Sequence, residues 1–311
     1  MNSGKDLHDD AEVLSAVDGS GNFCSSGVMS STSDQARAYL AQSSIPALPA
    51  EFVGQIIGDL SIAELMFGLI PLAADYAQPR ISGYKVGAVG LTPAGMLAFG
   101  TNFEFDQSAL AQTVHAEQCL IANLVAMGAE GLSKIAISAA PCGHCRQFLN
   151  ELADADDLEV IIPNHPPIRL KALLPEAFGP KDLDLEAGLM NPVDNRLQPV
   201  GAVSPLGQLA LAAANSSYAP YSKAPSGVAL ELADGRQFGG AYLENAAYNP
   251  SLPALQSAMA QLVMVGGKPE DVVAYAAAEL PNAPVKQFAF VQDLFARVAP
   301  EARAETIVLA R

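Results

Sequence analysis

The sequence predicts an α/β protein in which a three-layer α/β/α sheet occurs twice. Short apolar strand patterns alternate with helical patterns, as in sheets covered by helices. Segments of the first half recur in the second half at a constant shift, which indicates a duplicated domain. The chain has 311 residues, more than a single hydrophobic core usually organises.

The elements of the first copy follow from residue periodicity. Apolar residues at three- and four-residue spacing from Phe52 to Leu60 predict a helix. The segments 84–91 and 96–104 predict a β-hairpin, because Thr92-Pro93-Ala94-Gly95 between them is typical of a turn. The other predicted elements are helices over 112–127 and 142–152 and strands over 134–140 and 158–163.

Composition divides the chain into four parts. Residues 1–45 are rich in Ser, Gly and Asp, and we expect them to be poorly ordered. Residues 46–175 form the first copy with its N-terminal helices. Residues 176–205, rich in Pro, Gly and Asp, are predicted to be a linker, and residues 206–311 form the second copy.

The internal repeat is visible at a shift of 140 residues. Residues 100–104 align with 240–244, and residues 141–148 align with 281–288. A further match, of Tyr76-Ala77 with Tyr218-Ala219, needs a slip of two residues. At the 140-residue shift His115 falls on Leu255, while the two cysteines of 141–148 fall on Asn282 and Val285. The second copy therefore repeats the scaffold without these polar side chains.

Charge and hydropathy narrow the classes of partner. The formal net charge is −16, and only 17 Lys and Arg residues are spread along the chain. A protein that grips nucleic acid needs a basic face, so we expect no nucleic-acid partner but a small neutral substrate. We also expect no membrane span and no secretory signal, which makes the cytoplasm the default location.

Two short motifs carry the candidate chemistry. Cys142 and Cys145 lie three residues apart at a predicted helix start, where the helix dipole favours thiolate. His115 opens a second helix, and the strand over 134–140 brings both helix starts to one sheet edge. Two thiolates and one imidazole leave a fourth zinc position open for water. Glu117 then lies near the metal as a proton shuttle.

The order His115-Ala116-Glu117 followed by Pro141-Cys142-Gly143-His144-Cys145 is the signature of zinc deaminases. With TVHAEQ, PCGHCRQF and the second-copy segment ENAAYNPSLPALQ, residues 50 to 290 resemble cytidine deaminase, specifically its two-domain homodimeric branch. The resemblance implies a deaminase-like fold with one Zn²⁺ per chain. It also implies a cytoplasmic hydrolase of pyrimidine salvage that acts on carbon–nitrogen bonds in cyclic amidines.

The implied reaction converts cytidine and 2'-deoxycytidine to uridine and 2'-deoxyuridine plus ammonia. Hydroxide on zinc attacks C4 while Glu117 moves the protons. A free nucleoside fits better than a nucleotide, because a carboxylate beside the sugar repels phosphate.

The resemblance also assigns substrate contacts. Asn102 and Glu104 match the pair that binds the ribose, and Tyr84 stands where the family usually has a stacking Phe. The backbone of Ala116 holds the pyrimidine edge together with that of Cys142. In a homodimer, Ala247 and Tyr248 of the second copy contact the active site of the other subunit.

Other interpretations of the motifs remain open. One is a zinc deaminase of another amino-heterocycle. A second is a C-x-x-C dithiol redox site, although redox proteins of that type usually carry a Trp before the motif and this chain has none. A third is a zinc-binding module without turnover, which would not need Glu117. We expect His144 to be structural, Cys119 to lie in the core and Cys24 to be a free thiol.

Overall fold

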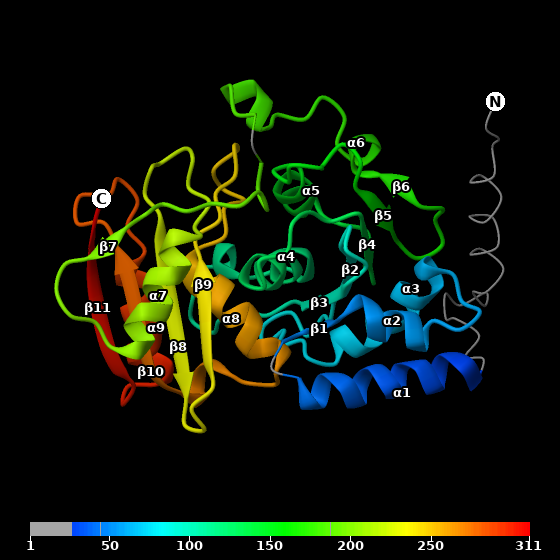
Figure 1. Ribbon diagram of the computed structural model, residues 1–311, viewed down its shortest axis with the longest axis horizontal. Coiled ribbons are helices and arrows are strands. Elements are labelled where there is room, and N and C mark those ends of the chain that lie inside the picture. The colour runs from blue at the N-terminus through cyan, green and yellow to red at the C-terminus, as the bar shows by residue number, and fades with distance from the viewer. Residues whose placement is uncertain (1–26, 44, 187) are drawn as a thin grey trace.

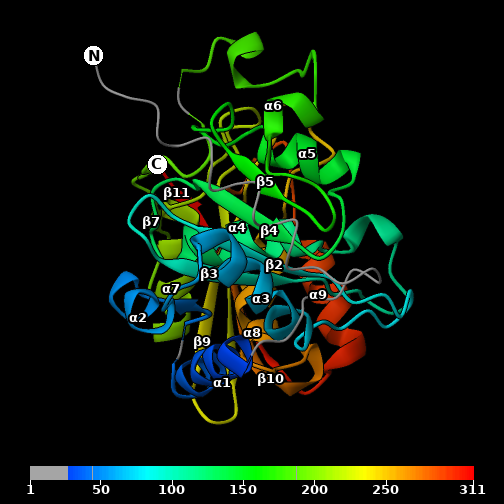
Figure 2. The same cartoon turned by 90° about the vertical axis from the view of Figure 1, so that its right-hand side faces the viewer.

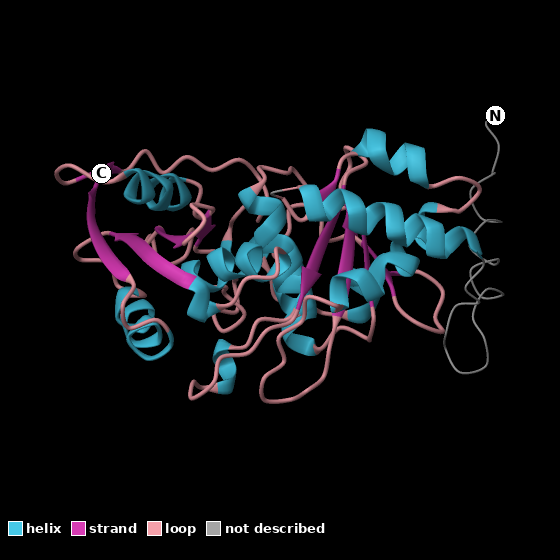
Figure 3. Ribbon diagram, turned by 90° about the horizontal axis from the view of Figure 1, so that it is seen from below, coloured by secondary structure: helices cyan, strands magenta, loops and turns pink. Residues whose placement is uncertain are grey.

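The computed structural model describes residues 27–43, 45–186 and 188–311. Cys24 therefore lies outside the described residues. No helix in this part of the chain is both long and apolar enough to cross a membrane. The chain forms two α/β units side by side, with α4 and α8 in contact between them (Figure 1). Figure 3 shows the two groups of strands separated by helices.

The first unit contains a six-stranded sheet in the order β1-β3-β2-β4-β5-β6. Only β4 and β5 run parallel to each other; the other neighbouring pairs in this sheet are antiparallel. Its strands are β1 (Ala47–Leu48), β2 (Gly87–Leu91), β3 (Leu97–Thr101), β4 (Lys134–Ile137), β5 (Glu159–Ile161) and β6 (Ile168–Arg169). Its helices are α1 (Gly27–Gln42), α2 (Ala50–Ile56), α3 (Ile62–Ala74), α4 (Ala116–Ala126), α5 (Gly143–Leu149) and α6 (Leu170–Leu173).

The second unit contains a five-stranded sheet in the order β7-β11-β10-β8-β9. Its strands are β7 (Gln198–Pro199), β8 (Ser226–Leu232), β9 (Gln237–Ala241), β10 (Val272–Glu279) and β11 (Arg303–Ala310), and its helices are α7 (Pro205–Asn215), α8 (Ala254–Met264) and α9 (Phe288–Val298). Here too one pair, β10 with β11, is parallel. The mixed sheet with helical layers is the predicted fold class, present twice.

Two glycines in each copy let a helix approach the sheet closely. A Cβ on Gly100 would lie 2.3 Å from the carbonyl oxygen of Ala116, and one on Gly240 would lie 2.4 Å from that of Ala254. Gly87 and Gly227 are related in the same way, through the backbones of α3 and α7. Each copy therefore needs glycine where its helix crosses the strand.

These contacts correct the predicted alignment. The strands β2, β3 and β4 correspond to β8, β9 and β10 at the 140-residue shift. The bridge Phe103–Val114 corresponds to the bridge Leu243–Leu252, and its first residue is shifted by 140 positions but its second by only 138. The connecting loop of the second copy is two residues shorter, so α4 matches α8 at a shift of 138. His115 therefore corresponds to Pro253, not to Leu255, and both residues are the N-caps of their helices.

The predicted match of Tyr76 with Tyr218, which needed a slip of two residues, is wrong, as the strand bridges again show. Gln78 bridges Phe103 as Tyr218 bridges Leu243, so Gln78 and Tyr218 are equivalent without any slip. The conclusion that the second copy lacks the polar ligands is unchanged.

The expectation that residues 1–45 are poorly ordered is wrong for 27–42, which form α1. Ala36 on this helix is fully buried, and the ring of Tyr39 lies 4.4 Å from that of Phe52. Figure 2, which turns the first copy towards the viewer, shows α1 beside α2 and α3. Packing against these neighbours stabilises a helix whose own polar composition predicted none.

Part of the predicted linker over 176–205 belongs to the second sheet. Gln198–Pro199 forms β7, which pairs antiparallel with Ala310 and Leu309 of β11. Just before it, the side chain of Asn195 donates to the carbonyl of Ser217 at 2.8 Å. This part of the chain therefore packs as structure of the second copy, and its Pro-rich composition did not indicate that.

Candidate metal and catalytic site

His115 is placed by a strand bridge on one side and a helix on the other. Val114 bridges Phe103, and His115 is the N-cap of α4. The backbone N–H of His115 donates to Oε1 of Gln118 at 3.3 Å, as in a capping box. The predicted helix over 112–127 begins only at Ala116, because Val114 pairs with the strand side instead.

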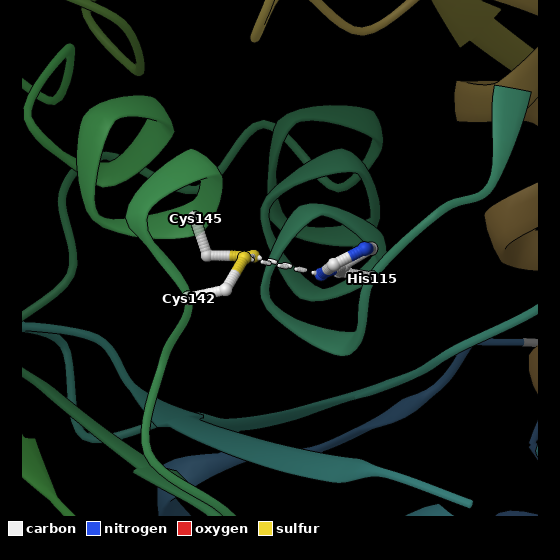
Figure 4. A group of neighbouring side chains, drawn as sticks. All are labelled: His115, Cys142 and Cys145. Carbon is white, nitrogen blue, oxygen red and sulfur yellow. Dashed lines mark hydrogen bonds between the residues drawn. The ribbon is translucent and has the colours of Figure 1, made fainter. Parts of the chain in front are cut away.

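The two cysteines lie at the start of α5. Cys142 is the N-cap, and Cys145 lies one turn later on the buried side. Nε of Arg146 donates to the carbonyl of Pro141 at 2.8 Å, which fixes the turn between β4 and α5. The imidazole at the start of α4 points towards both sulfurs, as Figure 4 shows.

The three ligand atoms have the spacing of a tetrahedral zinc site. His115 Nδ1 lies 3.5 Å from Cys142 Sγ and 3.3 Å from Cys145 Sγ, and the two sulfurs are 3.6 Å apart. Zinc bonds of about 2.3 Å to sulfur and about 2.05 Å to nitrogen require separations of roughly 3.8 Å and 3.6 Å. The donor set thus fits Zn²⁺, and it is the one such group among the residues that the structure describes.

The local electrostatics suit a thiolate and a proton carrier. The hydrogen bond between the two thiols lowers the pKa of Cys142 to about 4 and raises that of the more buried Cys145. Burial raises the pKa of Glu117, whose side chain is only 3% exposed. A carboxyl group that holds its proton more tightly than usual is suited to passing that proton on.

Asn102 and Glu104 hold the loop that carries Tyr84. Asn102 accepts from the N–H of Val86 and donates to the carbonyl of Tyr84, both at 2.8 Å. These bonds end the β2–β3 ladder, so β2 begins at Gly87 and not at Tyr84 as predicted.

Glu104 is also tied to this loop, and it lies near the metal site. Its Oε2 accepts from the N–H groups of Ile81 and Ser82. Burial opposes its ionisation, but the bonds from Ser82 and Ile81 and the nearby His115 hold the pKa of Glu104 below its usual value. An ionised carboxylate is therefore expected here at neutral pH.

The other predicted contacts are placed as follows. Ala116 is the first residue of α4 and is fully buried. Tyr84 is 62% exposed and Tyr248 is 68% exposed. Next to Ala247, the N–H of Ala246 donates to Glu151 of the first copy in the same chain at 2.8 Å.

The sequence did not single out two buried polar residues beside the site. Gln118, the third residue of α4, is 2% exposed, and its Nε2 lies 3.1 Å from Nε2 of His144. The capping-box spacing from His115 to Gln118 was the available signal. Glu151 is fully buried just beyond α5, and its partners are 67 to 95 residues away, so no local pattern indicates it.

The second copy fills the equivalent place without a metal ligand. Pro253 caps α8 and contributes no side-chain bond. The N–H of Ala254 instead donates to Oε1 of Gln287 at 2.8 Å. In the second copy a protein side chain therefore accepts the hydrogen bond from the first N–H of α8. The counterpart of this helix start in the first copy is the start of α4, which carries the ligand His115.

Two family models match the chain, one in each copy. Residues 61–159 match a model described as the cytidine and deoxycytidylate deaminase zinc-binding region, and residues 170–292 match a second model with the same description. Together they span well over half of the chain. The second match covers the copy in which the metal ligands are replaced.

Solved structures of cytidine deaminases are similar to part of the chain. The enzyme from Mycobacterium tuberculosis is 31% identical over 38% of this chain and 98% of its own, with a TM-score of 0.35. The enzyme from Burkholderia pseudomallei is 28% identical over 37% of this chain and 98% of its own, with a TM-score of 0.34. The enzyme from Mycobacterium leprae is 35% identical over 32% of this chain and 84% of its own, with a TM-score of 0.28.

Proposed function

This chain belongs to the cytidine and deoxycytidylate deaminase family, and we propose that it hydrolyses the exocyclic amino group of cytidine and 2'-deoxycytidine. The products are uridine and 2'-deoxyuridine plus ammonia. The observation that carries this proposal is the buried Glu117 beside a His115, Cys142 and Cys145 set with zinc spacing. A structural zinc site would not need a carboxyl group there.

His115, Cys142 and Cys145 would hold the metal. When bound, zinc supplies Lewis acidity that lets a water molecule lose a proton near pH 7. Glu117 would take that proton and deliver it to N3 of cytosine. It would then carry the proton of the hydroxyl group formed at C4 to the amino group, which leaves as ammonia while C4 becomes a carbonyl carbon. The burial of Glu117 beside the ligands supports this shuttle role, because burial raises its pKa towards the neutral range in which a carboxyl group can both accept and release a proton.

The substrate contacts follow the family pattern. Asn102 and Glu104 bind the ribose, Tyr84 packs on the base, and backbone groups at Ala116 and Cys142 hold the pyrimidine edge. The low pKa of Glu104 supports a nucleoside over a nucleotide, since an ionised carboxylate would repel a 5'-phosphate. The net charge of −16 acts in the same direction.

We further propose that the protein is a cytoplasmic homodimer that acts in pyrimidine salvage. Tyr248 is 68% exposed in the single chain, so its side chain is accessible to a second subunit. Ala247 and Tyr248 would then contact the partner's substrate.

An ultraviolet assay with parallel ammonia detection tests the function. Purified protein is given cytidine, 2'-deoxycytidine, cytidine monophosphate, adenosine or guanine. Turnover of the two cytosine nucleosides is expected. Turnover of the monophosphate alone would refute the nucleoside assignment, and turnover of a purine alone would favour a deaminase of another heterocycle. A redox-active dithiol without stoichiometric zinc would refute the deaminase altogether.

A further inference from the structure

One loop of the metal-free copy touches both helices that carry the metal ligands of the same chain. This loop, residues 245–250, follows β9 and precedes α8. Its first residues bond to α5 and to Glu151, two residues beyond the end of α5, and its last residue bonds to α4. Because α4 carries His115 and α5 carries both cysteines, the loop spans the two halves of the ligand set.

On the α5 side the loop is held by Glu151, a fully buried carboxyl group. Its Oε2 accepts from the N–H of Ala246 at 2.8 Å. Its Oε1 accepts from the hydroxyl of Tyr218 at 2.8 Å and from the hydroxyl of Tyr221. All three donors come from the second copy. Asn245 adds a bond from its Nδ2 to the carbonyl of Gln147 on α5 at 2.9 Å.

On the α4 side the contact passes through Gln118. Its Nε2 donates to the carbonyl of Pro250 at 3.3 Å, while its Oε1 accepts from the backbone N–H of His115 at 3.3 Å. The related residue Gln256 on α8 reaches back to Oε1 of Gln112 at 2.6 Å. Gln118 thus ties α4 to the loop of the second copy, and Gln256 ties α8 to the residues before α4 in the first copy. Gln118 also bonds to the backbone of the metal ligand His115.

In the metal-free copy the helix that follows β10 is α9, and it buries no carboxyl group. Its buried residues are Val291, Leu294 and Phe295, which are all apolar. A buried carboxyl group destabilises a protein unless its oxygens are hydrogen-bonded, so Glu151 depends on its three donors from the second copy.

We propose that Glu151 is a positioning residue that holds the 245–250 loop against α5 and thereby fixes the cysteines relative to His115. The inference rests on the proposed function in one respect, that the site holds zinc. Groups that orient metal ligands from outside the site typically change metal affinity by about 10- to 100-fold when they are removed. The metal-free copy then acts as a clamp on the metal site of its own chain.

The test compares zinc release in Glu151→Ala with the wild type, by transfer of zinc to a chromogenic chelator. We expect release to be about 10-fold faster or more, and we expect a shift in the visible absorption of the Co²⁺-loaded protein. Arg297→Gln is the matched control. Arg297 also joins the copies, through the carbonyls of Asp106 and Gln107, but these two residues are well separated in the sequence from all three ligands. The Arg297→Gln variant should leave both the rate of zinc release and the Co²⁺ spectrum unchanged.

Wild-type release and spectrum in a folded Glu151→Ala protein would overturn the proposal. If that variant does not fold, Tyr221→Phe removes one donor and leaves Tyr218 in place. It should speed zinc release in the same direction, and an unchanged rate would overturn the proposal. Zinc release does not require turnover, so faster release in a protein inactive on cytidine would reject the proposed function and keep this inference.

Discussion

Glu104 and Glu244 accept the same pair of backbone hydrogen bonds in the two copies of the fold. Glu104 Oε2 accepts from Ile81 and Ser82 at 2.6 and 2.9 Å, and Glu244 Oε2 accepts from Tyr221 and Ser222 at 2.8 and 3.1 Å. The carboxylate therefore anchors this loop whether or not the copy holds a metal. In the first copy we propose that the same carboxylate also contacts the substrate.

The structural half of this role can be measured in the second copy. Glu244→Gln weakens buried hydrogen bonds to a carboxylate, so the free energy of unfolding should fall by about 1.5–3 kcal/mol. Urea unfolding monitored by circular dichroism measures the change. Asp234→Asn, which changes an exposed ion pair with Arg236, is the control, and it should lower the free energy of unfolding by much less because exposed ion pairs contribute little to stability. Equal stability of Glu244→Gln and the control would show that these bonds contribute nothing.

The proton shuttle is tested by Glu117→Ala. Because Glu117 is not a metal ligand, the variant should keep its zinc, while kcat/KM for cytidine should fall by about 10²- to 10⁴-fold. Steady-state kinetics and metal analysis of the same preparation give both values. Glu51→Ala, an exposed change on α2, should behave as the wild type. Full activity of Glu117→Ala would remove the proposed mechanism.

Two cysteines on the first copy should respond differently to the same substitution. Cys145→Ser removes a ligand and should abolish stoichiometric zinc. Cys119→Ser changes a core thiol that contacts the carbonyl of Ala260 at 3.7 Å, so it should keep its zinc. Zinc content per chain, measured on both proteins, checks the difference. Zinc loss in both variants would mean that the loss reports on folding and not on ligation.

The ion pair between Arg80 and Glu270 joins the two copies and should make stability depend on pH. The hydrogen bonds from Arg80 lower the pKa of Glu270 in the folded protein. A carboxyl group whose pKa is lowered by folding stabilises the folded state at any pH above its unfolded pKa of about 4.3. This stabilisation is lost as the pH falls through the pKa of the folded state. Glu270→Gln should therefore be less stable than the wild type at pH 7, with the difference shrinking below pH 4. Asp106 also faces Arg80, at 3.6 Å, and keeps part of the attraction. A difference that stays constant from pH 7 to pH 3 would contradict this account.

Local sequence patterns predicted the parts of the fold and site that local chemistry decides. The spacing of Cys142 and Cys145 at a helix start, and the residue order after His115, were enough to predict the ligand set that the structure brings together. Strand and helix types in the first copy also followed from periodicity. The ends of these elements did not follow from periodicity. The bonds of Asn102 end the β2–β3 ladder, and the bridge of Val114 to Phe103 makes α4 begin later than predicted.

Features that depend on distant partners were not predictable from one sequence. The helix over 27–42 owes its order to packing of Ala36 and Tyr39 on later elements. The loop before α8 is two residues shorter than the loop before α4. This difference is visible only when the strand bridges before the two helices are compared in the structure. Glu151 gave no signal because its donors lie in the other copy.

The zinc content of purified wild-type protein tests the central claim, that the first copy of a duplicated deaminase fold holds the metal and the second copy does not. Metal analysis after exhaustive dialysis should give about one zinc per chain, as the single ligand set in the described residues predicts. Two zinc ions per chain would mean that the second copy binds metal as well. A protein that is folded and active on cytidine without zinc would contradict the account.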